Sequence, residues 1–377
     1  MTFQIFYITL ICTLCINCTG YTSLRAPSTL FRPTFSDSPL LSDRERHRLL
    51  RSTLEPEGDL EVLNKDSGLL PKFQGMSKIM YKFSRPHTIK GTILASIMSV
   101  SRAIREYNSI LTATSMTALL PRAVIGMLAL LCGNAYIVGI NQIYDVKIDE
   151  INKPFLPIAS KQLSPRNAWI VVLTCLTVGI SIVKTTFSPM IFGLYMIGAF
   201  LGTIYSVPPF QFKRFPILAG SIIACVRGFL LNFGVYYAVR EALQVGFQWN
   251  PVVAFISSFM TLFASVIAIT KDLPDVEGDI KYGVNTFAAK YGVVHVAKGA
   301  TLLLASAYSV AMTIPFTKIG VNFNKIPMIV GHAIALLYNV SIYKKLKTSQ
   351  QNVAEVKEYY RSVWNMFYWE YLLYLFI

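Results

Sequence analysis

Charged residues are scarce in this sequence, and acidic ones are the scarcest. Of 377 residues, 15% are charged and 53% are hydrophobic, and 20 Asp and Glu stand against 35 Lys and Arg. Together with a positive mean hydropathy, this composition excludes an ordinary soluble globular protein and is typical of a membrane protein. Carboxylates that occur in or beside apolar segments of such a chain are costly and normally have a function.

Cysteines and familiar catalytic motifs are few as well. Three of the six cysteines lie in long apolar runs, where they are packing residues, so no disulfide framework is implied. The others form a CxxCxxC pattern at Cys12, Cys15 and Cys18. A metal site there would need further ligands, which the sequence does not provide. The pattern is explained by the small residues of a targeting segment. The sequence contains no GxxxxGK(S/T) phosphate loop, nucleophilic triad or redox motif.

Long apolar runs dominate the chain after residue 80. Several are near or below the ~20 residues that a straight helical crossing of a bilayer needs. They lie at 87–100, 116–140, 168–183, 189–207, 217–239, 251–270, 299–316, 326–343 and 363–377. The sequence therefore predicts one all-α integral membrane domain, residues 81–377, with about nine transmembrane helices.

The net charge of +15 lies between these runs. Loops after even-numbered runs carry roughly fifteen Lys and Arg, against about six in loops after odd-numbered runs, which is a strong positive-inside bias. The sequence shows no soluble domain that carries a stripe of basic residues interleaved with aromatic ones, so nucleic-acid binding is not expected. The bias predicts that the loops after the second and sixth runs lie on one face of the membrane, together with the N-terminal region.

The first 80 residues differ from the rest. Residues 3–17 are apolar, like the core of a signal peptide, and 19–42 are rich in Ser, Thr, Pro and Arg, like a transit peptide. We interpret 1–42 as a bipartite targeting leader into a complex plastid; a single unusual transit peptide or a weak signal anchor are the alternatives. Residues 43–80 are charged and sparsely apolar, which predicts a soluble linker or a short surface helix.

The first acidic cluster, Asn141-Gln-Ile-Tyr-Asp145-Val-Lys-Ile-Asp149, follows the second apolar run. At helical spacing Asn141, Asp145, Asp149 and Lys153 share one face. Carboxylate oxygens are hard ligands suited to Mg²⁺, which usually bridges to substrate phosphates. We therefore predict Asp145 and Asp149 as metal ligands, with Asn141 and Lys153 contacting a diphosphate.

The second cluster, Lys271-Asp272-Leu-Pro-Asp275-Val-Glu-Gly-Asp279, follows the sixth run and repeats the DxxxD spacing. Asp275 and Asp279 are the corresponding predicted metal ligands, and Asp272 lies on the same face. Lys271 either contacts a phosphate or extends to the membrane interface. Pro274 predicts a bent or broken helix end, which is tolerated at membrane depth where it lines a cavity.

Four further residues are candidates for the site. Lys213 and Arg214 follow the fourth run on the same predicted membrane face; they either contact the diphosphate or anchor the loop. Tyr205 either stacks on a developing allylic cation or belongs to an aromatic belt. Arg227 lies inside the fifth run, where a charge is rarely accidental, so it either pairs with an aspartate or meets an acidic substrate.

These residues fit the ionisation of an allylic diphosphate. Metal and cations neutralise the leaving diphosphate, and an electron-rich acceptor attacks the cation within an apolar, water-excluding tunnel. A membrane transporter is the alternative from another class, because several spans and intramembrane charges fit that too. Two carboxylate clusters on one face argue against transport, since a path should carry polar groups along its length.

The motif pair NQxxDxxxD and KDxxDxxGD resembles that of the UbiA-type intramembrane aromatic prenyltransferases, over roughly residues 80–377. Finer signatures are most similar to the homogentisate solanesyltransferases of plastids. They are Ile204-Tyr-Ser-Val-Pro-Pro-Phe210 and Val226-Arg-Gly-Phe-Leu-Leu-Asn-Phe-Gly-Val-Tyr-Tyr-Ala238, whereas Asn152-Lys-Pro-Phe-Leu-Pro157 resembles the homogentisate branch as a whole. The resemblance implies helices around a central active-site cavity, a multi-pass plastid (chloroplast) membrane location, and Mg²⁺ as cofactor.

The implied reaction transfers a solanesyl group from its diphosphate to homogentisate with loss of CO₂. The product, 2-methyl-6-solanesyl-1,4-benzoquinol, is a plastoquinone precursor. The family pattern carries onto Asn141, Asp145, Asp149, Asp275 and Asp279 for Mg²⁺–diphosphate binding, with Lys153, Tyr205 and Lys213 following. Phytyl or geranylgeranyl diphosphate as donor, leading to tocopherols or tocotrienols, remains the alternative with the same fold. A family member that uses another aromatic acceptor is a second alternative.

Overall fold

A computed structural model of the chain describes residues 77–107, 113–246, 248, 250–281, 284 and 286–377. These residues form helices joined by turns, and they include no β-strand. The predicted all-α fold is therefore confirmed. The predicted leader, 1–42, and nearly all of the predicted linker, 43–80, lie outside the described residues and stay predictions.

The long helices begin as their sequences predict. Several have proline in the first turn, where its missing N–H costs nothing. Ser164 and Asn250 cap two of them by accepting hydrogen bonds from the Asn167 N–H (3.2 Å) and the Val252 N–H (2.8 Å). The first half of the chain contains α4 (Pro86–Glu106), α5 (Ala113–Tyr144), α6 (Val146–Asn152), α7 (Pro165–Thr186), α8 (Pro189–Ser206) and α9 (Pro216–Ile223).

The second half of the chain begins within one continuous helix, Pro216–Ala242. A π-helical segment η2 (Ala224–Leu230) joins α9 to α10 (Leu231–Ala242) without a break. The helices that follow are α11 (Pro251–Thr270), α12 (Val276–Lys281), α13 (Phe287–Tyr291), α14 (Val293–Thr313), α15 (His332–Thr348) and α16 (Val353–Tyr374). A short 3₁₀ turn η3 (Leu273–Asp275) separates α11 from α12, so the helix break predicted at Pro274 is confirmed.

Six stretches of the described chain are long and apolar enough to cross a membrane. They are 116–144, 165–186, 189–206, 216–242, 251–281 and 293–316. Helices α4, α15 and α16 coincide with the other three predicted spans, but they carry more polar side chains. Buried Asn339, His332 and Glu370 are examples. The count of nine spans therefore stays a prediction.

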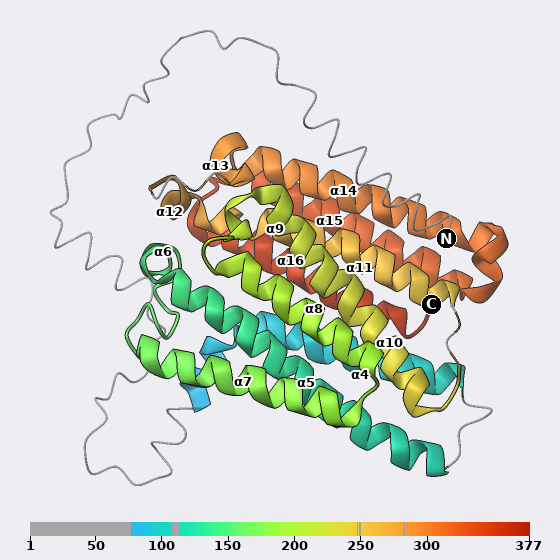
Figure 1. The fold of residues 1–377 in the computed structure, drawn as a ribbon. Coiled ribbons are helices and arrows are strands. Elements are labelled where there is room, and N and C mark those ends of the chain that lie inside the picture. The colour runs from blue at the N-terminus through green and yellow to red at the C-terminus, as the bar shows by residue number, and fades with distance from the viewer. Residues whose placement is uncertain (1–76, 108–112, 247, 249, 282–283, 285) are drawn as a thin grey trace, which may run out of the picture. The chain divides into compact units, whose positions relative to one another are not determined.

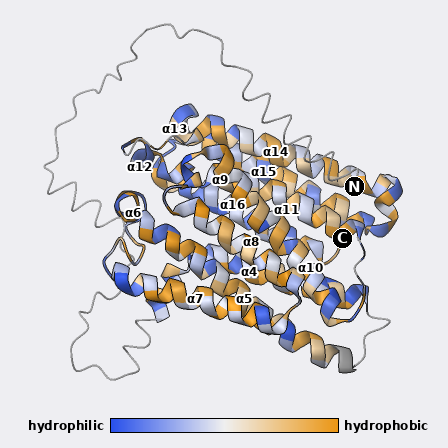
Figure 2. Ribbon diagram, viewed as in Figure 1, coloured by the Kyte–Doolittle hydropathy of each residue, from blue (hydrophilic) through white to orange (hydrophobic). Residues whose placement is uncertain are grey.

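The long helices run side by side, and the short helices α6, α12 and α13 gather at one end of them (Figure 1). Helix α5 packs on α4, α7 and α8, and α4 packs on α10 and α16. Helix α11 packs on α14, α16 and the α9–α10 helix. Orange, hydrophobic ribbon predominates on the long helices, and blue segments lie towards their ends, α6 and α12 among them (Figure 2). The two acidic clusters are therefore at the same end, as predicted.

Close backbone packing fixes the α9–α10 helix against α11. A methyl group at Gly228 would lie 2.2 Å from Cα and 2.5 Å from N of Thr261, so backbone rather than a flexible side chain would have to move. We expect Gly228→Ala to lower stability by about 1–3 kcal/mol, as overpacking does. The measurement is thermal unfolding of the purified protein in detergent.

Gly220→Ala is the matched control for this prediction. Gly220 lies on the same continuous helix, and a methyl group there meets nothing within 4 Å. We expect it to leave the melting temperature unchanged or to raise it slightly, since Ala is the better helix former. Equal melting temperatures for the two variants would contradict the packing argument.

Candidate active site

The first cluster keeps helical spacing although the helix is interrupted at Asp145, between α5 and α6. Backbone N–H groups of Asp145, Asp149 and Lys153 each donate to the carbonyl four residues earlier, at 3.1, 2.8 and 2.8 Å. Asp149 is buried and Asp145 is half-buried. The predicted series 141, 145, 149, 153 therefore lies one turn apart along one face.

Asn141 connects this cluster to two other helices. Its Nδ2 donates to Asp145 Oδ2 (2.9 Å) and to Ser206 Oγ (3.4 Å), at the end of α8. Its Oδ1 accepts from Arg85 Nη2 (3.1 Å), just before α4. The sequence argument missed Arg85, for which the only signal was its place before a helix-starting proline. The neighbouring Gln142 is structural, because its Nε2 donates to the Phe83 carbonyl (2.6 Å).

The second cluster turns into the same region through η3 and α12. Asp275 and Asp279 are both buried. Lys271 lies between partners, since its Nζ is 3.1 Å from Asp272 Oδ1 and donates to Tyr205 Oη at 3.0 Å. The Lys271 ammonium also lies 5.8 Å from the centre of the Tyr205 ring. In this structure, therefore, Lys271 faces the Tyr205 ring, for which stacking on an allylic cation was one of two predicted roles.

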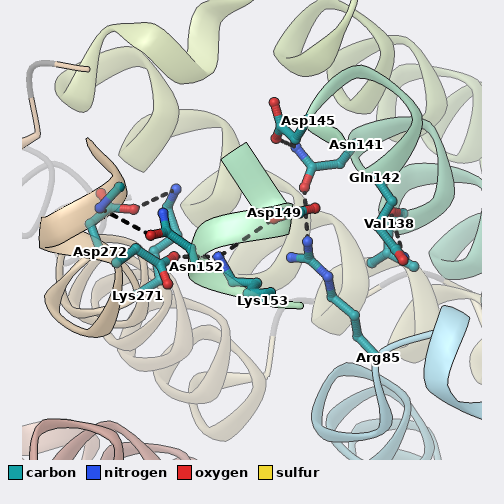
Figure 3. Close-up of polar contacts among 12 residues, drawn as sticks. Arg85, Val138, Asn141, Gln142, Asp145, Asp149, Asn152, Lys153, Lys271 and Asp272 are labelled. Atoms are coloured by element: carbon teal, nitrogen blue, oxygen red, sulfur yellow. Dashed lines mark hydrogen bonds and ion pairs between the residues drawn. The ribbon is translucent and has the colours of Figure 1, made fainter. Parts of the chain in front are cut away.

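The two clusters meet at α6. Lys153 Nζ bonds to Asp275 Oδ2 of the second cluster and lies 3.9 Å from Asp149 Oδ1 of the first. Asn152 Oδ1 accepts from the Gly278 N–H (3.1 Å). A methyl group at Gly278 would lie 2.1 Å from Asn152 Oδ1, so glycine permits this approach. Figure 3 shows Asn152 and Lys153 directed towards the segment that carries Lys271 and Asp272.

The loop after α8 adds two cations. Lys213 Nζ pairs with Asp145 Oδ1 at 2.5 Å, and Arg214 is exposed and lines the same cavity. All seven charged residues predicted in the clusters, together with Asn141, Tyr205, Lys213 and Arg214, line one cavity. The structure thus brings together residues that lie up to 138 positions apart in the sequence, from Asn141 to Asp279.

Burial governs the protonation of the α6 side chains. It raises the pKa of the Asp149 carboxyl to about 6, against the opposing effect of Lys153 and Arg85. Burial alone would lower the pKa of Lys153, but the Asp275 and Asp149 carboxylates outweigh it, and that pKa is raised. Lys153 is therefore a firm positive charge between the two clusters.

The carboxylates fit a magnesium ion that shares its shell with a substrate. Within the described part of the chain, no three His, Cys, Asp or Glu side chains lie close enough to form a ready-made metal site. Asp149 and Asp279 each keep a buried Oδ2 without a hydrogen-bond partner. Mg²⁺ is commonly held by one or two carboxylates together with substrate phosphates rather than by an all-protein cage. The donor set suits that mode of binding.

A large cavity of about 1440 Å³ opens at the clusters. It exceeds the ~300–1,000 Å³ of sites for drug-sized ligands. Its walls come from α4, α5, α8 and the α9–α10 helix, and they continue along α5 as far as Leu119. Apolar side chains dominate the walls away from the clusters. The charged end therefore leads into a long apolar compartment between the helices.

Arg227 lies in the wall of this cavity. Its Nη2 donates to Asn134 Oδ1 (3.1 Å), and its guanidinium carbon lies 5.7 Å from the centre of the Trp364 ring. His87 packs edge-on against Trp364, with ring centres 5.0 Å apart. No ion pair joins Arg227 to a carboxylate among the described residues. Its charge thus meets no aspartate, and no spacing in the sequence could have identified Trp364.

Comparisons with known proteins agree with this geometry. The profile of the UbiA prenyltransferase family matches residues 109–370. A probable chloroplastic homogentisate phytyltransferase 2 of Oryza sativa subsp. japonica is 49% identical, over 78% of this chain and 76% of its own. The chloroplastic homogentisate solanesyltransferase of Arabidopsis thaliana is 47% identical, over 83% of this chain and 80% of its own.

A solved structure gives the same arrangement of helices. The UbiA homologue from Archaeoglobus fulgidus, bound to GPP and Mg²⁺, superposes with a TM-score of 0.53. It covers 78% of this chain and 99% of its own, at 17% identity, which supports the fold alone. With the family profile and the two plant relatives, the conclusion is direct: this chain belongs to the UbiA prenyltransferase family.

Proposed function

We propose that this protein transfers a solanesyl group from its diphosphate to homogentisate, in a Mg²⁺-dependent reaction that releases diphosphate and CO₂. The product would be 2-methyl-6-solanesyl-1,4-benzoquinol, for plastoquinone synthesis in a plastid membrane. The observation that carries the proposal is the meeting of two carboxylate clusters, through Lys153 and Asp275, at the mouth of an apolar cavity. The chloroplastic relatives support the location.

The charged end of the cavity binds the diphosphate. Asp145, Asp149, Asp275 and Asp279 would hold Mg²⁺, which, when bound, offsets the negative charge of the leaving diphosphate. Lys153 and Lys213 now pair with carboxylates of the two clusters. When the donor enters, their ammonium groups are placed to bind its phosphate oxygens.

The apolar walls contribute by excluding water. The bond between the first prenyl carbon and the diphosphate oxygen breaks, with both electrons leaving on oxygen, and a delocalised allylic cation remains. Water would trap that cation, so the apolar lining keeps it available for the acceptor. Tyr205 also lines the cavity, and its ring, which already lies near the Lys271 ammonium, can stabilise positive charge. The acceptor ring then forms the new C–C bond and the attacked ring carbon loses its proton; the acetate side chain loses CO₂ and takes up a proton to become the methyl group.

Arg227 is the proposed binding group for the acid of the acceptor. Asn134 orients the guanidinium, and Trp364 offers a flat face beside it. A carboxylate meeting Arg227 would gain a charge-assisted hydrogen bond within a partly desolvated site. Homogentisate has both an aromatic ring, which can lie against Trp364, and a carboxylate, which can bind Arg227.

The length of the donor distinguishes this proposal from its alternative. A phytyl or geranylgeranyl donor would use the same charged site, and the rice relative carries the name of a phytyltransferase. The size of the cavity favours the longer solanesyl group. Transport of a substrate is the remaining alternative, and it would leave the diphosphate intact.

The test is a membrane assay with labelled homogentisate and Mg²⁺, in which solanesyl, geranylgeranyl and phytyl diphosphate are offered separately. We expect a decarboxylated product and released pyrophosphate, highest with solanesyl diphosphate and abolished by chelating Mg²⁺. A preference for phytyl or geranylgeranyl donors would assign the protein to tocopherol or tocotrienol synthesis. No product from any donor would show that homogentisate is not the acceptor. Substrate movement without pyrophosphate release would favour transport.

A further inference from the structure

The cavity continues far beyond what a short prenyl donor needs. Along α5 its lining extends from Asp145 to Leu119, an axial distance of about 39 Å at 1.5 Å per residue. The lining at that depth includes Leu119, Val239 and Ala242, which pack in a small apolar cluster with Ala103, and also the exposed Arg122. The cavity thus has a charged mouth at one end and a largely apolar floor, beside one arginine, at the other.

A passage between α8 and α10 lies about halfway to this floor. A methyl group at Gly234 would have a single neighbour, Leu194 Cδ1, at 3.9 Å, and both residues line the cavity. Tyr195, next to Leu194, lies against Gly133 of α5. Gly133 is about 18 Å below Asp145 along α5. Ala238, one turn beyond Gly234, lines the next part of the wall.

The depth of this passage separates two classes of donor. A twenty-carbon donor has about 16 carbons in its main chain, and at ~1.5 Å per bond they reach at most roughly 24 Å. The main chain of a solanesyl group has about 36 carbons and reaches at most roughly 54 Å. Anchored at the clusters, the fully extended short chain passes the level of Gly133 by at most about 6 Å, whereas the long chain reaches up to about 36 Å beyond it and must continue towards Leu119.

We propose that Gly234 and Ala238 determine donor length: they hold open the passage to the lower half of the cavity, which receives the distal isoprene units of donors longer than twenty carbons. This inference rests on the proposed function and names the residues that would give it its specificity. A leucine at position 234 would project towards Leu194 and narrow the passage from both sides. The charged mouth would be unaffected.

Gly193→Leu provides the matched control. Gly193 directly precedes Leu194 on α8, but it does not line the cavity, and a methyl group there meets nothing within 4 Å. Gly234→Ala adds a smaller obstruction in a helix, where alanine is favoured over glycine. It therefore allows a smaller change in the ratio of solanesyl to geranylgeranyl affinity to be measured even where the leucine variant folds poorly.

The experiment measures binding of non-hydrolysable solanesyl and geranylgeranyl thiodiphosphates to the full-length protein in detergent with Mg²⁺. We expect the ratio of solanesyl to geranylgeranyl affinity to fall at least tenfold in Gly234→Leu and Ala238→Leu. It should fall less in Gly234→Ala and stay within twofold of wild type in Gly193→Leu. A defect in folding would weaken both ligands together and leave the ratio unchanged.

Ratios in Gly234→Leu, Gly234→Ala and Ala238→Leu equal to that of Gly193→Leu, with geranylgeranyl affinity retained at the wild-type value, would overturn the inference. The binding assay contains no acceptor, so it is independent of whether homogentisate is the substrate. Failure of wild-type protein to prenylate homogentisate would count against the proposed function, whereas an unchanged binding ratio would count against the length-selecting passage.

Discussion

Exchanging Asp275 for Asn is expected to reduce kcat for prenyl transfer by about a thousandfold at saturating Mg²⁺ and substrates. Asp275 is buried, is one of the four proposed metal ligands, and bonds to Lys153 at the junction of the two clusters. The exchange keeps the side-chain size but removes the charge. Losing one preorganised group that stabilises developing charge typically costs about 10²–10³ in kcat, and here the metal shell is weakened as well.

Glu277→Gln is the matched control for this experiment. Glu277 lies on α12 between Asp275 and Asp279, is exposed, and does not line the cavity. We expect its kcat to remain within about twofold of wild type, because surface substitutions seldom perturb a site. The measurement is kcat of both variants from initial rates over a Mg²⁺ titration. A kcat for Asp275→Asn within tenfold of that for Glu277→Gln would remove Asp275 from the catalytic site.

Replacing Arg227 with Leu is expected to raise the KM for homogentisate by roughly 30–150-fold, as loss of a ~2–3 kcal/mol charged hydrogen bond does. The KM for the prenyl diphosphate should change less than threefold. The physical reason is that Arg227 contacts Asn134 and the Trp364 ring and forms no carboxylate ion pair within the described residues, so its charge is free for the acceptor.

Two comparisons make this prediction specific. Arg227→Lys keeps the charge but loses the planar guanidinium, and we expect an intermediate KM. Homogentisate amide, which lacks the carboxylate charge, should inhibit wild-type and Arg227→Leu proteins equally, because the interaction is absent in both. Equal increases in KM for homogentisate and for the prenyl donor would show that Arg227 supports the cavity as a whole rather than the acceptor.

The register of each acidic cluster could be predicted from the sequence because it depends on local geometry. Residues Asn141, Asp145 and Asp149 lie four apart, and the backbone hydrogen bonds retain this spacing across the helix break. The break at Pro274 follows from the missing N–H of proline. The positive-inside bias placed both clusters at one end, which the positions of α6 and α12 match.

Contacts between distant segments could not be predicted in the same way. Periodicity shows which face of a helix is apolar, but not which other helix lies against it. The pairing of Lys153 with Asp275, the bond of Asn152 to Gly278 and that of Arg85 to Asn141 all depend on packing between helices. The number of spans was likewise uncertain, because helices buried inside the bundle can carry polar side chains that lower their hydropathy.

The central claim is that both clusters hold one metal–diphosphate group, and crystals with Mn²⁺ and a prenyl thiodiphosphate test it most directly. Mn²⁺ accepts the same oxygen ligands as Mg²⁺, and its anomalous scattering locates it. We predict metal in contact with Asp145 or Asp149 and with Asp275 or Asp279, with the diphosphate between the clusters and the prenyl chain in the cavity. A diphosphate bound at one cluster alone, or outside the cavity, would contradict the account.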